Sequence, residues 1–306
     1  MVVRNLAALA CVCMVLISGW SVSAQAQTAG RFRFGIAVGT DDEIRERLEP
    51  YRTYLEDVVD LPVDLFLIPT LDELTAALVN GDVDYALLSS SAYGAASVLC
   101  SCVEPLVSAR PDVGRGRYRA VMIARRPLDL ASLAGKRLAV QSNGSTTGYR
   151  IPLANLLKEG INVRDHFSTL LRVDSGVDGL LAIMDGRADA SLGWSTLTGS
   201  QQTGYTAGTL NDYFLSGARG LDKLAVIWTS APLPYDAHAV RGDLPDDLKV
   251  RLKEGLLRLL GAAPDVYLAI EPDLPGGFLP VTDADYEAFK VTFGEDARKV
   301  LERPQQ

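Results

Sequence analysis

Hydrophobic and polar residues follow two different periods in the first third of the chain. Residues 31–39 alternate and then become apolar, as a buried strand does, and residues 42–59 carry apolar positions at helical spacing after an acidic start. Residues 63–68 and 83–88 are predicted to be strands, with a helix at 71–79 that ends at Asn80-Gly81. Strands that alternate with helices in this order predict parallel βαβ units.

One segment of this pattern occurs twice. Residues 74–88 and 179–192 each contain an amphipathic helix, a glycine suited to a left-handed cap, a charged residue and an aspartate that opens a strand. These aspartates, Asp84 and Asp189, are expected to hold the turn before the strand. Two copies about 100 residues apart predict two similar lobes, because a solenoid needs at least three shorter repeats.

The rest of the chain gives the predicted division into lobes. A strand at 118–124 is placed to cross from one lobe to the other, and a strand at 224–228 is placed to return. Helices are predicted at 246–260 and 283–301, with a Pro/Gly-rich loop at 272–280 between them. We therefore expect an α/β protein in which 30–122 and 224–306 form lobe one, 123–223 form lobe two, and a ligand cleft lies between them.

The first residues predict a secretory signal. Arg4 is followed by an apolar stretch from Leu6 to Ile17 and by small residues that end near Ala24 or Ala26. The apolar stretch is shorter than a permanent membrane span. We predict removal of residues 1–26, no lipid on Cys11, and a periplasmic product.

Charge limits the classes of partner. The chain has 38 acidic and 30 basic residues, a formal net charge of −8. Its overall field therefore does not attract anions or nucleic acid, so an anion site must be local and nucleic acid is not an expected partner.

Two polar turns follow predicted strands. Ser89, Ser90 and Ser91 precede Tyr93 after the strand at 83–88, and residues 142–149 follow a strand at 137–141. Ligands of open α/β sheets bind beyond the carboxyl ends of strands, and a helix start with hydroxyls and unpaired N–H groups attracts anions. We interpret the turns as equivalent positions of the repeated unit, one per lobe, that close on an anion. The residues leave open the alternative that these serines are ordinary helix caps.

Other motifs give no catalytic centre. Gly144 to Gly148 lacks the lysine of a phosphate-binding loop, and the two histidines, His166 and His238, lie in no metal-binding or triad spacing. No metal or cofactor is predicted. Cys100 and Cys102 are predicted to form a disulfide in an oxidising compartment, with metal binding less favoured because no histidine is nearby.

A series of segments in fixed order carries a family resemblance: Pro50–Leu55, Gly81–Asp84, Ser91–Tyr93, Glu104–Leu106, Tyr118, Leu133–Ala139, Ser145–Tyr149, Ile227–Ser230 and Pro232–Pro234. The series resembles the phosphate, phosphite and phosphonate binding-protein family of the type 2 periplasmic fold, the soluble receptors of ABC importers. It extends over nearly all of the expected mature chain.

The resemblance implies a set of ligand contacts. Tyr93 and the hydroxyls and amides of Ser145, Thr146 and Thr147 would hold the oxyanion of the ligand, and Asp178 would reach a ligand proton or amine. The chain departs from the family in two places, since Val177 stands where a histidine is common and Leu71 where a tyrosine is common. These departures imply a smaller or less charged oxyanion, or an organic molecule with one acidic group.

The predicted function is therefore capture of a small oxyanion, of the phosphonate, phosphite or phosphate class, by a monomeric periplasmic receptor that delivers it to the permease of an ABC importer. One alternative is a receptor for a membrane sensor kinase, with arsenite bound by free Cys100 and Cys102 thiols as a further hypothesis. A secreted hydrolase is the third, but it needs a nucleophile beside a positioned base, and no spacing indicates one. The chain is predicted not to be an enzyme.

Overall fold

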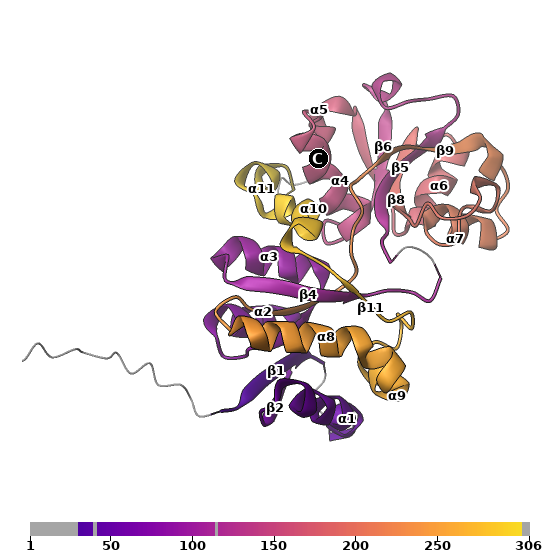
Figure 1. The fold of residues 1–306 in the computed structure, drawn as a ribbon. Helices are drawn as coiled ribbons and strands as arrows, with labels where there is room; N and C mark the ends of the chain where they lie inside the picture. Colours follow the sequence, from indigo (N-terminus) through magenta and orange to yellow (C-terminus); the bar gives the residue numbers. More distant parts are fainter. Residues whose placement is uncertain (1–29, 39–41, 114–115, 302–306) are drawn as a thin grey trace, which may run out of the picture. The chain divides into compact units, whose positions relative to one another are not determined.

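Two β-sheets, each flanked by helices, organise the chain (Figure 1). The computed structural model describes residues 30–38, 42–113 and 116–301, and residues 31–306 form one compact unit. The predicted signal at 1–26 lies outside the described residues. Within them, no helix is both long and apolar enough to cross a membrane.

The first sheet has six strands in the order β11-β4-β10-β3-β1-β2. Its strands are β1 (Phe32–Ala37), β2 (Val63–Ile68), β3 (Tyr85–Leu88), β4 (Val103–Ala109), β10 (Ala237–Arg241) and β11 (Phe278–Pro280). β1 pairs in parallel with β2 and β3, whereas β10 runs antiparallel to both β3 and β4.

The second sheet has five strands in the order β7-β6-β8-β5-β9. Its strands are β5 (Arg119–Arg125), β6 (Arg137–Val140), β7 (Thr169–Arg172), β8 (Ala190–Ser195) and β9 (Leu224–Thr229). β6 pairs in parallel with β7 and β8, whereas β5 runs antiparallel to β8 and β9. Apart from β11, the two sheets therefore have the same order, with β6, β7, β8, β5 and β9 in the places of β1, β2, β3, β10 and β4.

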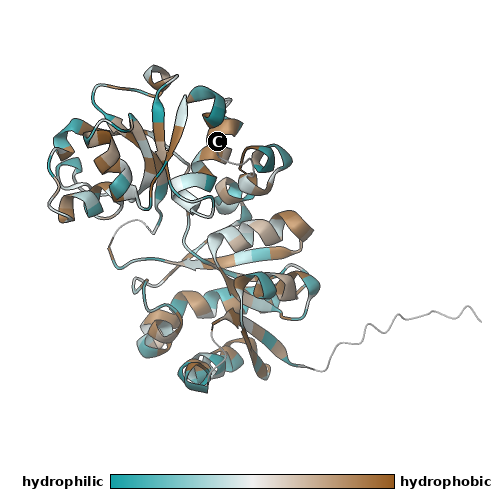
Figure 2. Ribbon diagram, turned by 180° about the vertical axis from the view of Figure 1, so that it is seen from behind, coloured by the Kyte–Doolittle hydropathy of each residue, from teal (hydrophilic) through white to brown (hydrophobic). Residues whose placement is uncertain are grey.

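The helices follow the predicted alternation. They are α1 (Asp42–Val59), α2 (Leu71–Asn80), α3 (Ser90–Cys100), the π turn η2 (Thr146–Arg150) that continues into α4 (Ile151–Lys158), α5 (Val163–His166), α6 (Gly176–Met184), α7 (Thr209–Leu215), α8 (Asp246–Ala262), α9 (Pro264–Ile270), α10 (Glu287–Lys290) and α11 (Glu295–Leu301). Figure 2 shows hydrophobic residues gathered on the strands and alternating with hydrophilic ones along the helices. This is the pattern expected of amphipathic helices that cover sheets.

The repeated segment has the same structural use in both sheets. Asp84 accepts hydrogen bonds from the backbone N and Nε of Arg33 at 2.9 and 3.0 Å. Asp189 accepts the same two bonds from Arg137, also at 2.9 and 3.0 Å. The glycines before them, Gly81 and Gly186, are left-handed, with φ of 81° and 72°. Each aspartate thus ties the start of one strand to its parallel neighbour, as the sequence predicts.

The pairing of β9 differs from expectation. β9 does not return the chain to the first sheet but forms the edge of the second, where it pairs with β5. The chain therefore crosses between sheets before Arg119 and returns after Thr229, so all of β5 and β9 belong to one sheet. The predicted division, with 30–122 and 224–306 in lobe one and 123–223 in lobe two, stays a prediction. β5 and β9 differ from it, since both strands belong to the second sheet.

The predicted C-terminal helix at 283–301 is also different. It is divided into η5 (Asp283–Tyr286), α10, η6 (Val291–Phe293) and α11, and Gly294, whose backbone is extended with ψ of 153°, separates η6 from α11. The break lets these short pieces contact two helices, since α10 packs on α3 and α11 packs on α4. The bounds of the helix at 42–59 and of the strand at 63–68 are confirmed.

Candidate ligand-binding site

The predicted turn after β6 is folded back onto the end of its strand. The backbone N of Gln141 donates to Gly148 O at 3.0 Å, and the Ser145 hydroxyl donates to Gln141 Oε1 at 3.0 Å. A Cβ on Gly148 would lie 2.4 Å from the Gln141 side chain, so any larger residue here would displace that side chain. The turn is therefore held in one conformation before the helix begins.

Ser145 acts as the helix cap of this turn. Its hydroxyl accepts from Gly148 N at 3.1 Å, the bond that an N-cap residue makes. Thr146 and Thr147 are half-buried, and their hydroxyls have no hydrogen-bond partner among the described residues. Both interpretations of the turn thus apply. Ser145 caps the helix, and the two threonines lie at a helix start whose hydroxyls and positive dipole end could face a ligand.

The turn after β3 already faces a carboxylate of the protein itself. Ser89 caps α3, and the buried Ser90 hydroxyl donates to Pro234 O at 3.1 Å. The backbone N–H of Ser90 donates to the carboxylate of Asp236, a residue on the returning segment between the sheets. A negative charge at the first turn of a helix is favourable, so Asp236 occupies the place where an anion would bind. Ser91 is half-buried beside it.

The Asp236 side chain reaches solvent, yet its carboxyl group is less readily ionised than usual. Its side chain reaches solvent, but the surrounding protein partly desolvates the carboxyl group. This desolvation, together with the negative charge of Glu271, raises the pKa of Asp236 to about 6. A carboxyl group of this kind changes protonation easily near neutral pH and accepts a hydrogen bond when it is ionised.

Tyr93 is buried in packing. Its hydroxyl donates to Asp283 Oδ1 at 2.9 Å, and its ring lies 4.5 Å from that of Tyr286, measured between centroids. Burial, and next the Asp283 carboxylate, raise the pKa of Tyr93 well above its usual range. The hydroxyl is therefore engaged by the C-terminal segment, and its expected contact with a ligand stays a prediction.

Asp178 forms a helix cap with Ser175. The Ser175 hydroxyl donates to Asp178 Oδ2 at 2.6 Å and accepts from Asp178 N at 3.1 Å. This reciprocal pair closes the first turn of α6. Val177 packs against the apolar cluster under α6, so the position lacks a polar side chain. The contact of Asp178 with a ligand stays a prediction.

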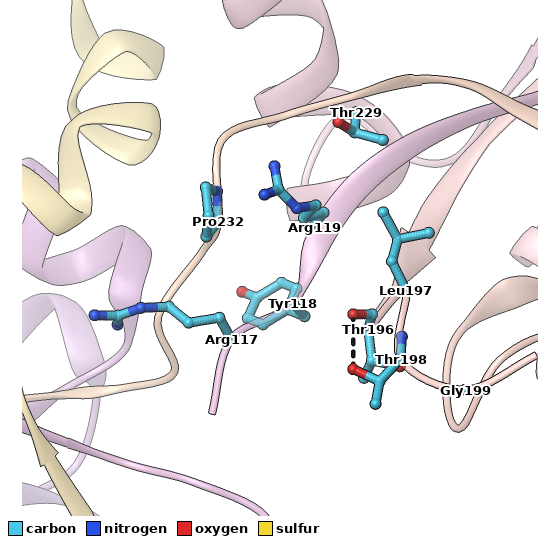
Figure 3. Close-up of a pocket in the computed structure, with 9 residues that line it drawn as sticks. All are labelled: Arg117, Tyr118, Arg119, Thr196, Leu197, Thr198, Gly199, Thr229 and Pro232. Carbon is cyan, nitrogen blue, oxygen red and sulfur yellow. Dashed lines mark hydrogen bonds between the residues drawn. The ribbon is translucent and has the colours of Figure 1, made fainter. Parts of the chain in front are cut away.

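A cavity of about 810 Å³ opens beside Tyr118 (Figure 3). Its walls come from the start of β5, from the loop after β8 and from the segment after β9, namely Arg117, Tyr118, Arg119, Thr196, Leu197, Thr198, Gly199, Thr229 and Pro232. Tyr118 connects the cavity to the α3 turn, because its hydroxyl is hydrogen-bonded to the Ser90 side chain. Trp194 packs edge-on against the Tyr118 ring at 6.1 Å.

The cysteines lie away from this cavity, at the end of α3. Cys100 and Cys102 form a disulfide in the structure. Neither sulfur is a free thiol that could bind arsenite. Among the described residues, no group of three or more histidine, cysteine, aspartate and glutamate side chains is placed to hold a metal ion.

Sequence reasoning missed Asp236, Tyr118 and Arg119 as candidate site residues. Asp236 follows the Pro232–Pro234 segment of the family resemblance, and a carboxylate beside a crossing segment was a usable signal. Arg119 gave none, because an arginine at a strand start is usually solvated. The two polar turns also hold non-equivalent positions, since one follows β3 and the other follows β6, the counterpart of β1. The true counterpart of Ser89 is the loop that begins at Thr196.

Comparison with known proteins agrees with this architecture. Residues 35–286 match the family model described as "ABC transporter, phosphonate, periplasmic substrate-binding protein". The phosphate-import protein PhnD of Mycolicibacterium smegmatis is 23% identical over 274 residues, which cover 83% of this chain and 82% of that protein.

Two solved structures share the fold. The chain matches XAC2383 from Xanthomonas citri bound to ATP with a TM-score of 0.55 and 18% identity, over 90% of this chain and 98% of that one. It matches the same protein bound to chloride ion with a TM-score of 0.53 and 17% identity, over 89% and 98% of the two chains. The predicted fold, two sheets with helices as in type 2 periplasmic binding proteins, is confirmed.

Proposed function

We propose, because this chain belongs to the periplasmic substrate-binding proteins of phosphonate ABC transporters, that it binds a small phosphorus oxyanion and delivers it to the permease of such an importer. A solute-binding role follows from the family. The ligand, the residues that hold it and the closing motion are the parts that we propose here.

The observation that carries the proposal is the half-buried start of η2. Thr146 and Thr147 offer two hydroxyls that have no partner among the described residues, at the first turn of a helix that continues to Lys158. Hydroxyls and backbone N–H groups at a helix start bind oxyanions with the help of the helix dipole. In an acidic protein this is the kind of local site that an anion needs. The ligands of the two Xanthomonas citri structures, ATP and chloride, are also anions.

Asp236 restricts the chemical class of the proposed ligand further. A carboxylate repels a second full negative charge but accepts a hydrogen bond from an O–H or N–H group. We therefore expect a ligand that carries a proton or amine toward the α3 turn, such as a singly ionised phosphonate, phosphite, hydrogen phosphate or aminoalkyl phosphonate. In the closed receptor, the ligand would lie between the η2 turn and Asp236.

The partner and location follow from the same proposal. The family is periplasmic, and we propose that residues 1–26 direct secretion and are then removed. The mature chain would act as a monomer, since one cleft needs no second subunit. A ligand that binds the closed form better than the open one supplies the whole signal to the permease, so no chemical step is required.

Isothermal titration calorimetry with a ligand panel tests the proposal. The panel contains phosphate, phosphite, methylphosphonate, 2-aminoethylphosphonate, ATP, sulfate and arsenite. We expect at least one phosphorus oxyanion to bind, and a Thr146→Val/Thr147→Val double variant to lose at least tenfold in affinity, because each hydroxyl contributes a hydrogen bond to a charged group.

A Thr53→Val variant on the outer side of α1 is the matched control and should bind like the wild type. Failure of every phosphorus oxyanion to bind to the folded protein would contradict the proposed ligand class. Equal affinity in the double variant would move the site away from η2.

A further inference from the structure

Among the described residues, one charge dominates the cavity beside Tyr118. Arg119 projects into it between Thr229 and Pro232, whereas the guanidinium of Arg117 turns away from the threonines (Figure 3). Arg117 is neutralised by Asp285, with 2.9 Å between Nη2 and Oδ1. Arg119 forms no ion pair with a carboxylate in the part of the chain that the structure describes, and its Nη1 donates to the backbone oxygen of Ser230.

The lining around Arg119 is polar without acidic groups. No aspartate or glutamate is among the described residues that form the walls, and hydroxyls of Thr196, Thr198 and Thr229 are present. The Thr229 hydroxyl has no hydrogen-bond partner among those residues. A cation with spare N–H donors, set among hydroxyls in a net acidic protein, favours an anionic group.

The loop opposite Arg119 is held in an unusual conformation. Leu197 has φ of 50°, a region that a leucine rarely adopts, and its side chain lies in the cavity wall (Figure 3). Its backbone N is fixed by the Ser195 hydroxyl at 3.0 Å, and Thr196 is bonded to the Thr206 hydroxyl at 2.9 Å. The fold therefore stabilises a strained loop that keeps this wall in place, as is common at ligand sites.

Tyr118 places this cavity next to Ser90 and Asp236, which form one side of the proposed oxyanion site. Its ring forms one wall, and its hydroxyl contacts Ser90, whose backbone N–H contacts Asp236. A substituent on the ligand would pass the Tyr118 ring to enter the cavity. We infer that the cavity binds a second negatively charged group on the ligand through Arg119, so that the receptor prefers phosphonates or phosphate esters with a carboxylate or another phosphoryl group on the substituent.

This inference rests on the proposed function and concerns the same site. It assigns opposite tasks to two charges: Asp236 accepts a proton or amine near the first oxyanion, and Arg119 pairs with the distal anion. Simple alkyl phosphonates would bind without using the cavity, and cationic substituents would be disfavoured in it.

Calorimetry with three probes tests the assignment: methylphosphonate, phosphonoacetate and 2-aminoethylphosphonate. We expect wild-type protein to bind phosphonoacetate at least tenfold more tightly than methylphosphonate, with a difference that shrinks as KCl is raised. Arg119→Gln should lower the affinity for phosphonoacetate by about tenfold to a hundredfold, the range for a charge-assisted bond, and should change that for methylphosphonate less than about threefold. Arg119→Lys should recover part of the loss.

Arg125→Gln is the matched control, since Arg125 lies at the other end of β5 and also donates to backbone oxygens, those of Ile183 and Met184. It should leave all three affinities unchanged, and the melting temperature of each variant verifies folding. If methylphosphonate binds but Arg119→Gln leaves the ratio of affinities unchanged, or if the wild type prefers 2-aminoethylphosphonate, the inference is overturned and the proposed function stands. If none of the three probes nor any other phosphorus oxyanion binds, the proposed function itself fails.

Discussion

The two copies of the repeated unit are alike at one end and different at the other. At the amino end of the strand, Asp84 and Asp189 make the same pair of bonds to Arg33 and Arg137. At the carboxyl end, β3 leads directly into α3 and meets Asp236, whereas β8 leads into the strained Thr196–Gly199 loop and the cavity with Arg119. The end that stabilises the fold is alike in the two copies, and the end at which we propose that the ligand binds differs.

The copies also invert one packing contact. In the first, Leu74 of α2 lies over Gly35 of β1, where an added Cβ would be 2.7 Å from Leu74 Cδ1. In the second, the corresponding residues are Gly179 of α6 and Ala139 of β6, at 3.6 Å from an added Cβ to the alanine Cβ. In the first copy the glycine lies on the strand and the larger side chain on the helix, whereas in the second the glycine lies on the helix and a small alanine on the strand, so helix and strand stay close in both copies.

Removing the two aspartates should have the largest effect on stability. Asp84 and Arg33 are 12% and 31% exposed, against 24% and 43% for Asp189 and Arg137, and Arg33 also donates to the backbone of Gly81. We expect Asp84→Ala to lower the free energy of unfolding by about 2–3 kcal/mol and Asp189→Ala by about 1–2 kcal/mol, because the more buried arginine loses more when it is left unpaired.

Urea denaturation monitored by fluorescence measures both values. Equal losses at the two positions would contradict the conclusion that the first clamp is the more buried and the stronger. Asp84→Asn and Asp189→Asn, which keep one acceptor oxygen, are the matched variants and should each lose less than the alanine substitution.

The inverted contact gives an effect of intermediate size. Gly35→Ala should destabilise the protein by about 1–3 kcal/mol, since the new methyl group meets the buried Leu74 and Val83 side chains. Gly179→Ala should be within about 1 kcal/mol of wild type, because the Ser191 hydroxyl can rotate away, the Ser191 Cβ at 3.1 Å needs only a small shift, and alanine favours the helix. Thermal unfolding of both variants decides the matter, and a larger loss for Gly179→Ala would refute the inverted packing.

The smallest expected effect is a pH dependence at the carboxyl end of the first copy, because solvent screens the exposed Asp236 side chain. The pKa of Asp236 is raised to about 6, so between its ordinary value near 4 and about 6 the folded protein holds a proton that the unfolded chain releases. Stability from this residue is therefore present below pH 4 and is lost as pH rises through 6. Asp236→Asn should melt at the same temperature as wild type near pH 4 and at a higher one at pH 7.

A melting difference that stays constant between pH 4 and pH 7 would rule out this titration.

Much of the architecture could be predicted, because the signals were local. Periodicity predicted α1 and β2 to the residue, and the glycine, charged residue and aspartate of the repeat predicted the two clamps. The position of β9 depended on pairing with a strand about 100 residues away, which no local pattern encodes. The broken C-terminal helix depended on Gly294 and on contacts with α3 and α4.

The candidate site was only partly within reach of the sequence. The helix start at Ser145, Thr146 and Thr147 was visible because hydroxyls, glycine and a strand end are adjacent in the chain. Asp236 and Arg119 lie beside residues that are distant in sequence: Asp236 accepts a hydrogen bond from Ser90, and Arg119 lines the same cavity as the Thr196–Gly199 loop. Which groups lie beside such a charge depends on how distant segments of the chain pack together, so a single sequence does not predict these neighbours.

Strand exchange between the two halves of the chain has a consequence for how the protein is made and taken apart. β5 comes from the first half but completes the second sheet, and β10 comes from the second half but joins β3 to β4 in the first. A fragment that ends before residue 230 would expose the edges of β3 and β4, which invites aggregation. The protein is therefore poorly suited to expression as separate lobes, and better suited to reconstitution from split fragments that fold together. During synthesis, the first sheet cannot be completed until the last quarter of the chain has left the ribosome.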